Sequence, residues 1–198
     1  MVHKQLKALD IYGEGINWKE LYDSFVDGQE HGIYFYSYND SSIPYYIGKS
    51  QAKSYKIVGR VWDELNDYAN GRYWLSKNPD LLADLTCFKK DYPDTGNFFA
   101  PGTDPGKGDF KKAVEKLLKN TVISFSYLQD DNDNQGLYLI NDVECQLQYN
   151  LVKKYDLDKG WVGDGGAKLS KGKNKNHDLH INYTVDPMII KLDEEILK

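Results

Sequence analysis

The chain has 198 residues, which is enough for a sizeable core, and we expect a single domain over 1–198. Hydrophobic residues make up 40% and charged residues 28%, a composition that is typical of a globular protein and excludes a disordered chain. The formal net charge of −5 argues against an indiscriminate nucleic-acid binder, which is usually basic, and leaves room for a selective one.

The sequence carries no membrane signal and no cysteine motif. No apolar run approaches the roughly 20 residues of a membrane helix, and the N-terminus lacks the apolar segment of a secretory signal. We therefore expect a cytoplasmic protein that has no membrane partner. Cys87 and Cys145 are far apart and lack metal-ligand spacing, so they are interpreted as buried free thiols.

The first half of the chain is predicted to form a helix, a β-hairpin and a second helix. Apolar residues at helical spacing predict a short helix over 18–25. β-branched and aromatic residues predict strands over 32–38 and 43–48, with a turn-like stretch between them and a polar loop over 49–54 after them. An apolar stripe predicts the second helix over 55–68.

The second half is predicted to carry three helices and one strand. The Pro- and Gly-rich stretch that opens it suggests a long ordered loop after its first helix. Asp109 can cap the clearest amphipathic helix of the chain. In chain order, these elements are helix 79–90, helix 109–120, strand 121–128 and helix 141–155, with a charged loop over 130–135 before the last.

Two tripeptides stand out, Gly32-Ile33-Tyr34 and, after eleven residues, Tyr46-Ile47-Gly48. Each lies in a predicted strand. The pair resembles the hairpin that defines the GIY-YIG nuclease family, and the order of the predicted elements is similar to the core of that fold. The resemblance implies an α+β fold in which a small three-stranded sheet with a β-hairpin is flanked by helices. Three segments fall outside the resemblance: an N-terminal extension over 1–30, an insertion over 71–108 and a C-terminal extension over 157–198.

The resemblance implies a metal-dependent endonuclease and assigns roles to three residues of this region. Tyr34 would act as the general base, and Tyr46 would assist it by orienting or hydrogen bonding. Arg60, twelve residues after Gly48 on the second predicted helix, would stabilise charge on the transition-state phosphate. Without the motif, the tyrosines would be interpreted as sheet aromatics and the arginine as a solvated side chain.

Further along the chain, Glu144 is similar to the carboxylate that holds one Mg²⁺ or Mn²⁺ in this family. The spacing from Asn141 to Glu144 also fits a capping box at a helix start, so both interpretations stand. Lys49 either contacts the scissile phosphate or is a solvated lysine. Glu64 occupies a place where many members carry His or Tyr, and the family's Asn has no secure equivalent here.

Duplex DNA is the expected substrate, and we expect a site-specific enzyme of the restriction type. Cutting both strands would then need a homodimer or two successive events. A basic tract is expected to contact phosphates, unless it is only a solvated loop; it comprises Lys168, Lys171, Lys173 and Lys175. Two alternatives are a binding module that keeps the fold without the activity, and a repair or mobile-element nuclease that a partner directs to its target.

Overall fold

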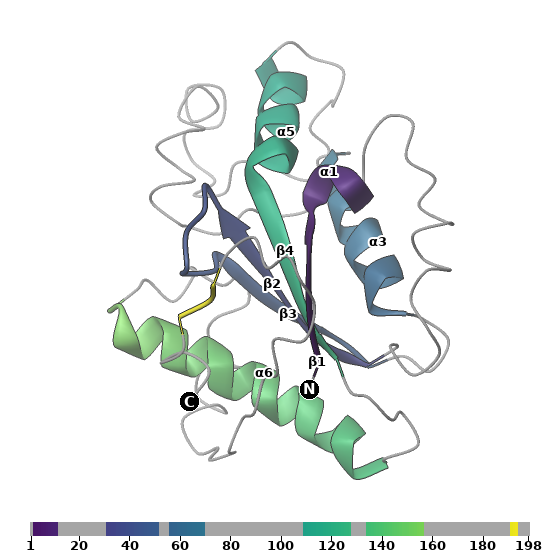
Figure 1. The fold of residues 1–198 in the computed structure, drawn as a ribbon, viewed down its shortest axis with the longest axis vertical. Helices are drawn as coiled ribbons and strands as arrows, with labels where there is room; N and C mark the ends of the chain where they lie inside the picture. The colour runs from purple at the N-terminus through teal and green to yellow at the C-terminus, as the bar shows by residue number, and fades with distance from the viewer. Residues whose placement is uncertain are drawn as a thin grey trace.

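The structure is a computed structural model, and it describes residues 2–11, 31–51, 56–69, 109–127, 134–156 and 191–193. The described part is an α+β fold built on a four-stranded antiparallel sheet with helices on both faces (Figure 1). None of its helices is long and apolar enough to cross a membrane.

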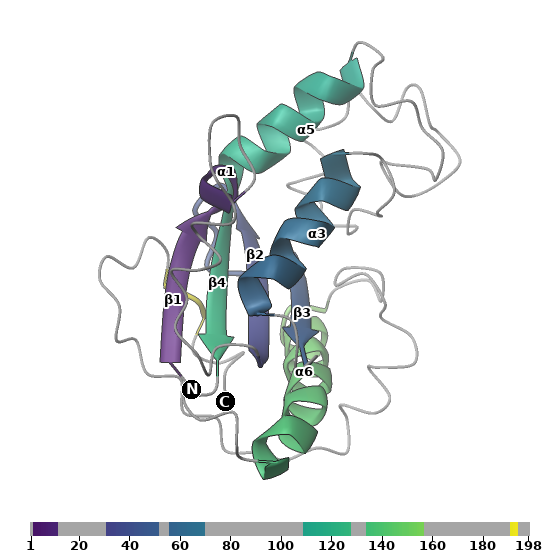
Figure 2. The ribbon, with the colours of Figure 1, turned by 90° about the vertical axis from the view of Figure 1, so that its right-hand side faces the viewer.

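The sheet consists of β1 (Val2–Lys7), β2 (Gly32–Tyr38), β3 (Tyr46–Ser50) and β4 (Thr121–Tyr127). Its strand order is β1-β4-β2-β3, as Figure 2 shows from left to right. The two tripeptides therefore lie on neighbouring strands, as predicted. The prediction of a three-stranded sheet was wrong, because β1 pairs with β4 and adds a fourth strand. Residues 2–7 show no clear alternation of apolar and polar side chains, so only this long-range pairing identifies them as a strand.

Strands β2 and β3 form a hairpin, and a tight turn directly follows β2. Asn39 and Asp40 have φ angles of 50° and 57°, and the Ser41 amide donates to the Tyr38 carbonyl over 3.1 Å. Positive φ at two central residues with this hydrogen bond is the pattern of a type I′ turn, which Asn and Asp tolerate well. Strand β3 begins at Tyr46 and continues through Ser50, so it starts and ends later than predicted.

Four helices surround the sheet: α1 (Ala8–Ile11), α3 (Ile57–Ala69), α5 (Asp109–Asn120) and α6 (Asn134–Lys154). The predictions for α3 and α5 are confirmed. Helix α6 begins at Asn134, well before the predicted start at residue 141. The sequence did not predict this first part of the helix, because Gly136 and its polar neighbours hide the helical pattern there. Asn141 and Glu144 thus lie inside the helix, and the capping-box interpretation was wrong. The helices predicted over 18–25 and 79–90 lie outside the described residues.

Alternation along the strands divides the core in two. One core lies between one face of the sheet and helices α1, α3 and α5, and its largest buried side chains are Tyr34, Tyr36, Tyr45 and Phe125. The other core lies between the opposite face and α6. It comprises Ile33, Phe35, Ile47, Ile140, Val143, Leu147 and Leu151, together with Leu192. The first of these cores contains the polar cluster described next.

Candidate functional site

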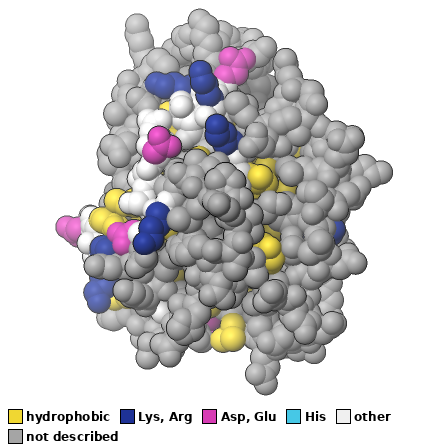
Figure 3. All heavy atoms as spheres, viewed as in Figure 1, with side chains coloured by type: hydrophobic (Ala, Val, Ile, Leu, Met, Phe, Trp, Pro, Cys, Tyr) yellow, Lys and Arg dark blue, Asp and Glu magenta, His cyan; other side chains and the backbone are white. Residues whose placement is uncertain are grey.

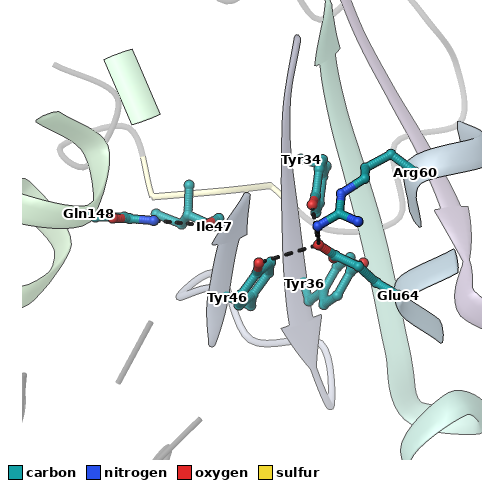
Figure 4. A network of polar contacts seen from close by, with 7 residues as sticks. All are labelled: Tyr34, Tyr36, Tyr46, Ile47, Arg60, Glu64 and Gln148. Atoms are coloured by element: carbon teal, nitrogen blue, oxygen red, sulfur yellow. Dashed lines mark hydrogen bonds and ion pairs between the residues drawn. The ribbon is translucent and has the colours of Figure 1, made fainter. Parts of the chain in front are cut away.

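Three tyrosine hydroxyls converge on the carboxylate of Glu64 (Figure 4). Tyr34 donates to Oε1 over 2.5 Å, and Tyr36 donates to Oε2 over 2.7 Å. Tyr46 makes a longer contact of 3.4 Å with Oε1. The Arg60 guanidinium forms an ion pair with the same Oε1 over 3.0 Å. We call these five residues the tyrosine–glutamate cluster.

Regular secondary structure accounts for the positions of all five side chains. Tyr34 and Tyr36 are two residues apart on β2, so they share one face of the sheet. Tyr46 on β3 is the cross-strand partner of Tyr36, and the two ring centroids are 5.2 Å apart. Arg60 and Glu64 are four residues apart on α3, where neighbouring turns of a helix place side chains together.

The cluster is buried at its centre and reaches solvent on one side. Glu64 is 0% exposed and Tyr34 is 1% exposed, whereas the Arg60 side chain is 40% exposed. Tyr46 is half-buried. A molecule in solution would therefore meet the guanidinium and the edge of Tyr46 before it met the carboxylate.

Burial controls the charge of Glu64. Loss of solvation raises the pKa of this carboxyl above its usual range, and this effect outweighs the attraction of Arg60 and the hydrogen bonds from the three tyrosines, which lower it. A carboxylate in this condition accepts a proton more readily than one in water. Burial also raises the pKa of the nearby Tyr45 hydroxyl, which therefore stays neutral.

A second polar cluster lies on the opposite face of the sheet. The Lys49 ammonium donates to the Asn141 amide oxygen and forms an ion pair with Oε2 of Glu144 over 3.5 Å. Lys49 alternates with Gly48 along β3, so it faces away from the tyrosines. In the same region, Gln148 of α6 donates to the Ile47 carbonyl over 2.9 Å, and Figure 4 shows this contact on the far side of β3 from Tyr46.

The predicted site residues thus fall into two groups. Tyr34, Tyr46 and Arg60 come together around Glu64. Glu144 and Lys49 pair with each other, and the alternation of β3 separates their contact from the tyrosine face. The predicted basic tract, with Lys168 at its start, lies outside the described residues.

The divalent ion that the resemblance implies does not fit beside Glu144 in this arrangement. The Glu144 carboxylate and the Asn141 amide supply oxygen atoms of the kind that Mg²⁺ prefers. However, the ammonium of Lys49 already lies against both groups. Among the described residues, no group of three or more His, Cys, Asp or Glu side chains could hold a metal ion.

Sequence reasoning missed the two residues that complete the tyrosine–glutamate cluster, Tyr36 and the central Glu64. Both carry a local signal. Tyr36 follows Tyr34 at the strand period of two, and Glu64 follows Arg60 at the helical spacing of four. The family pattern marks Glu64 only as a departure, whereas a carboxylate at that spacing is a ready partner for an arginine.

Described basic and acidic side chains lie interspersed on the molecular face seen in Figure 3. They do not form a continuous patch of one sign on that part of the described surface.

No protein-family model, curated protein or solved structure matches the chain. The geometry of the two clusters therefore carries the functional argument.

Proposed function

We propose that this protein is an endonuclease of the GIY-YIG type that hydrolyses phosphodiester bonds in duplex DNA. One observation carries the proposal. Two tyrosines from separate strands and an arginine from the next helix converge on one carboxylate, and these are the three residues of this region to which the resemblance assigns catalytic roles.

The chemistry of the tyrosine–glutamate cluster suits the proposed reaction. Hydrolysis needs a base that takes a proton from water and a cation that offsets the charge growing on the phosphate. The Tyr34 hydroxyl is the proposed base. The half-exposed Arg60 guanidinium is the proposed cation, because its planar fork of donors matches phosphate oxygens. Tyr46 orients the base from the neighbouring strand.

The proposed dependence on Mg²⁺ or Mn²⁺ rests on the resemblance alone. A divalent ion supplies charge neutralisation at a phosphate when it is bound. Its proposed ligand Glu144 is paired with Lys49 in this structure. The residues of the tyrosine–glutamate cluster can therefore be assigned roles, whereas the position of an ion cannot.

Specificity and assembly belong to the proposal as well. We propose site-specific cleavage of the restriction type by a cytoplasmic enzyme, with a homodimer or two successive events to cut both strands. Phosphate contacts by Lys168, Lys171, Lys173 and Lys175 remain a prediction outside the described residues. The proposal of selective binding is supported by the formal net charge of −5, which disfavours indiscriminate attraction to DNA.

A second candidate function is a binding module that keeps this fold without cleaving DNA. Its support is the burial of the cluster, since Glu64 and Tyr34 are almost completely enclosed. A buried carboxylate that receives hydrogen bonds from three hydroxyls can also act purely as a polar core network. Cleavage by the purified chain separates the two candidates.

The test is incubation of the purified protein with long duplex DNA in Mg²⁺, in Mn²⁺ and in a chelator, resolved on a gel. Tyr34→Phe is expected to lower the cleavage rate by about 10²–10⁴-fold, the usual contribution of a general base. Tyr149→Phe is the matched control, because it removes a tyrosine hydroxyl from α6 and keeps the ring beneath Lys153. Intact DNA under every condition would overturn the nuclease proposal and favour the binding module. Equal cleavage by wild type and Tyr34→Phe would overturn the assigned base.

A further inference from the structure

We propose that the Glu64 carboxylate receives the hydroxyl proton of Tyr34 at the moment when Tyr34 takes a proton from the attacking water. This inference rests on the proposed function and adds a residue for which the motif gave no role. Glu64 acts through Tyr34 and does not touch the DNA. The cluster would then be a concerted proton relay, in which one proton passes from the attacking water to Tyr34 while another passes from Tyr34 to the buried acid.

The geometry of the contact suits proton transfer. The Tyr34 hydroxyl donates to Oε1 of Glu64 over 2.5 Å, which is at the short end for a hydrogen bond from a hydroxyl to a carboxylate. A phenol oxygen that donates its proton can also accept one, because it has lone pairs to spare. Tyr34 can therefore lose one proton and gain another without moving.

A relay removes a difficulty of using tyrosine as a base. The ordinary pKa of a tyrosine hydroxyl is about 10, so the group is neutral near neutral pH and is a poor proton acceptor. If its own proton passes to Glu64 in the same step, the phenolate never has to form. Burial favours this direction of transfer, since it raises the pKa of the Glu64 carboxyl.

The transfer also changes the state of Arg60. While Glu64 is ionised, its Oε1 atom forms an ion pair with the Arg60 guanidinium over 3.0 Å. Once Glu64 is protonated, the guanidinium loses this negative partner as negative charge builds up on the phosphate oxygens. More of its positive charge is then available to the substrate, so the base step and the charge-stabilising step reinforce each other.

The atoms balance along this path. An O–H bond of water breaks and its proton goes to the Tyr34 oxygen, while the original Tyr34 proton goes to Oε1 of Glu64. The water oxygen forms a bond to phosphorus, and the bond from phosphorus to the leaving oxygen breaks. The leaving oxygen takes a proton from solvent, and Glu64 later returns its proton to solvent through Tyr34. The net change is one water added across one phosphodiester.

Among the residues that the structure describes, the other groups that face Glu64 are neutral phenols. Tyr36 holds Oε2 over 2.7 Å, Tyr46 lies 3.4 Å from Oε1, and the neutral Tyr45 interacts with the carboxylate from further away. Within the described part of the chain, Arg60 is therefore the charged partner of this carboxylate. Tyr36 offers a useful comparison, because it contacts the oxygen that takes no part in the relay.

The decisive experiment is Glu64→Gln, which keeps the shape and cannot accept the proton. We expect kcat to fall about 10²-fold or more with KM little changed, because the loss is confined to the transition state. Wild-type kcat should rise with pH as Glu64 ionises, and this acidic limb should disappear in Glu64→Gln. Tyr36→Phe should lower kcat less than about tenfold and keep the rise of kcat with pH, because it removes only one hydrogen bond to Oε2, the oxygen that takes no proton. Tyr149→Phe should match wild type.

Two outcomes would overturn the relay and leave the proposed function standing. One is full kcat for Glu64→Gln while Tyr34→Phe is inactive. The other is an acidic limb that survives in Glu64→Gln. If Tyr34 and Glu64 act in one relay, the double variant Tyr34→Phe with Glu64→Gln should lower kcat no further than the more damaging of the two single changes. Losses in kcat that add up would contradict the relay. If Glu64→Gln does not fold, Glu64→Asp retains the acid and should show a lower kcat with the limb preserved; loss of that limb would also contradict the relay.

Discussion

The ring of Tyr34 fills the space that a side chain at Gly48 would occupy. The two residues are cross-strand partners in β2 and β3. A Cβ atom placed on Gly48 would lie 2.4 Å from Cζ of Tyr34 and 2.6 Å from its hydroxyl oxygen. The glycine of the second tripeptide therefore makes room for the tyrosine of the first, which gives the paired motif a physical basis in this chain.

Gly48→Ala should displace Tyr34 and disrupt the tyrosine–glutamate cluster. Because the ring is enclosed by the core, it has little freedom to retreat, and we expect a loss of about 1–3 kcal/mol in the free energy of unfolding. Cleavage should fall with it, since the Tyr34 hydroxyl would move away from Glu64. Urea unfolding and the DNA gel assay measure the two effects.

Ser37→Ala on β2 is the matched control for this change. Its buried hydroxyl has no hydrogen-bond partner in the part of the chain that the structure describes, so its removal should be close to neutral or slightly stabilising. If Gly48→Ala were as stable as Ser37→Ala, the close approach of Tyr34 to Gly48 would be wrong.

The stability of the protein should depend on pH through Glu64. Because burial raises the pKa of this carboxyl, the folded protein keeps the proton at pH values where the unfolded chain has lost it. The resulting stabilisation is complete at low pH and disappears as the pH rises through the folded pKa. Thermal unfolding between about pH 4 and about pH 8 should show wild type losing stability relative to Glu64→Gln, which does not titrate. If wild type instead gained stability relative to Glu64→Gln as the pH rose, Arg60 and the tyrosines would lower the pKa of Glu64 more than burial raises it.

Lys49 should compete with divalent ions for the oxygens of Glu144 and Asn141. Removing the ammonium in Lys49→Met leaves a buried carboxylate without this counter-ion. We expect Mn²⁺ to bind Lys49→Met at least about tenfold more tightly than wild type, a difference of about 1.4 kcal/mol. Titration of Mn²⁺ followed by electron paramagnetic resonance, without DNA, measures the change directly.

The matched control for the metal experiment is the double variant Lys49→Met with Glu144→Gln, which should lose the added affinity. Equal Mn²⁺ binding by wild type and Lys49→Met would show that the ammonium does not block an ion. Tight binding by wild type that is lost in Glu144→Gln would restore Glu144 as the metal ligand that the resemblance implies.

The segment 191–193 should be held to the fold by its apolar residue more than by its charge. Leu192 is buried against the α6 face of the sheet, and Leu192→Ala should cost about 2–5 kcal/mol. Asp193 pairs with Lys154 over 3.0 Å at the surface, and Asp193→Ala should cost less than about 1 kcal/mol. Urea unfolding of both variants checks the order, and the reverse order would contradict it.

Local rules predicted the part of the site that depends on local geometry. The motif and the strand-forming residues placed Tyr34 and Tyr46 on the two strands of one hairpin, and the apolar stripe placed Arg60 on the second predicted helix, which is α3. The same rules could have found Glu64, because its spacing from Arg60 is helical. The family pattern has His or Tyr at this position, so the resemblance alone gives no role to a carboxylate there.

The position of Glu144 could not be predicted in the same way. It depends on which face of the sheet α6 covers, and this follows from the packing of side chains such as Ile140 and Leu147 against strands far away in sequence. It also depends on where α6 begins. The early start at Asn134 places Glu144 in the interior of the helix, beside Lys49, and not at a helix end.

The division of charge between α3 and the sheet bears on the order of folding. Arg60 and Glu64 form their ion pair within one helix, whereas β2 and β3 contribute only uncharged hydroxyls to the cluster. Contacts within a helix form faster than a β-hairpin such as the one that joins β2 and β3. The acid and its cation can therefore pair before the hairpin closes over them, so that the two charges enter the core together.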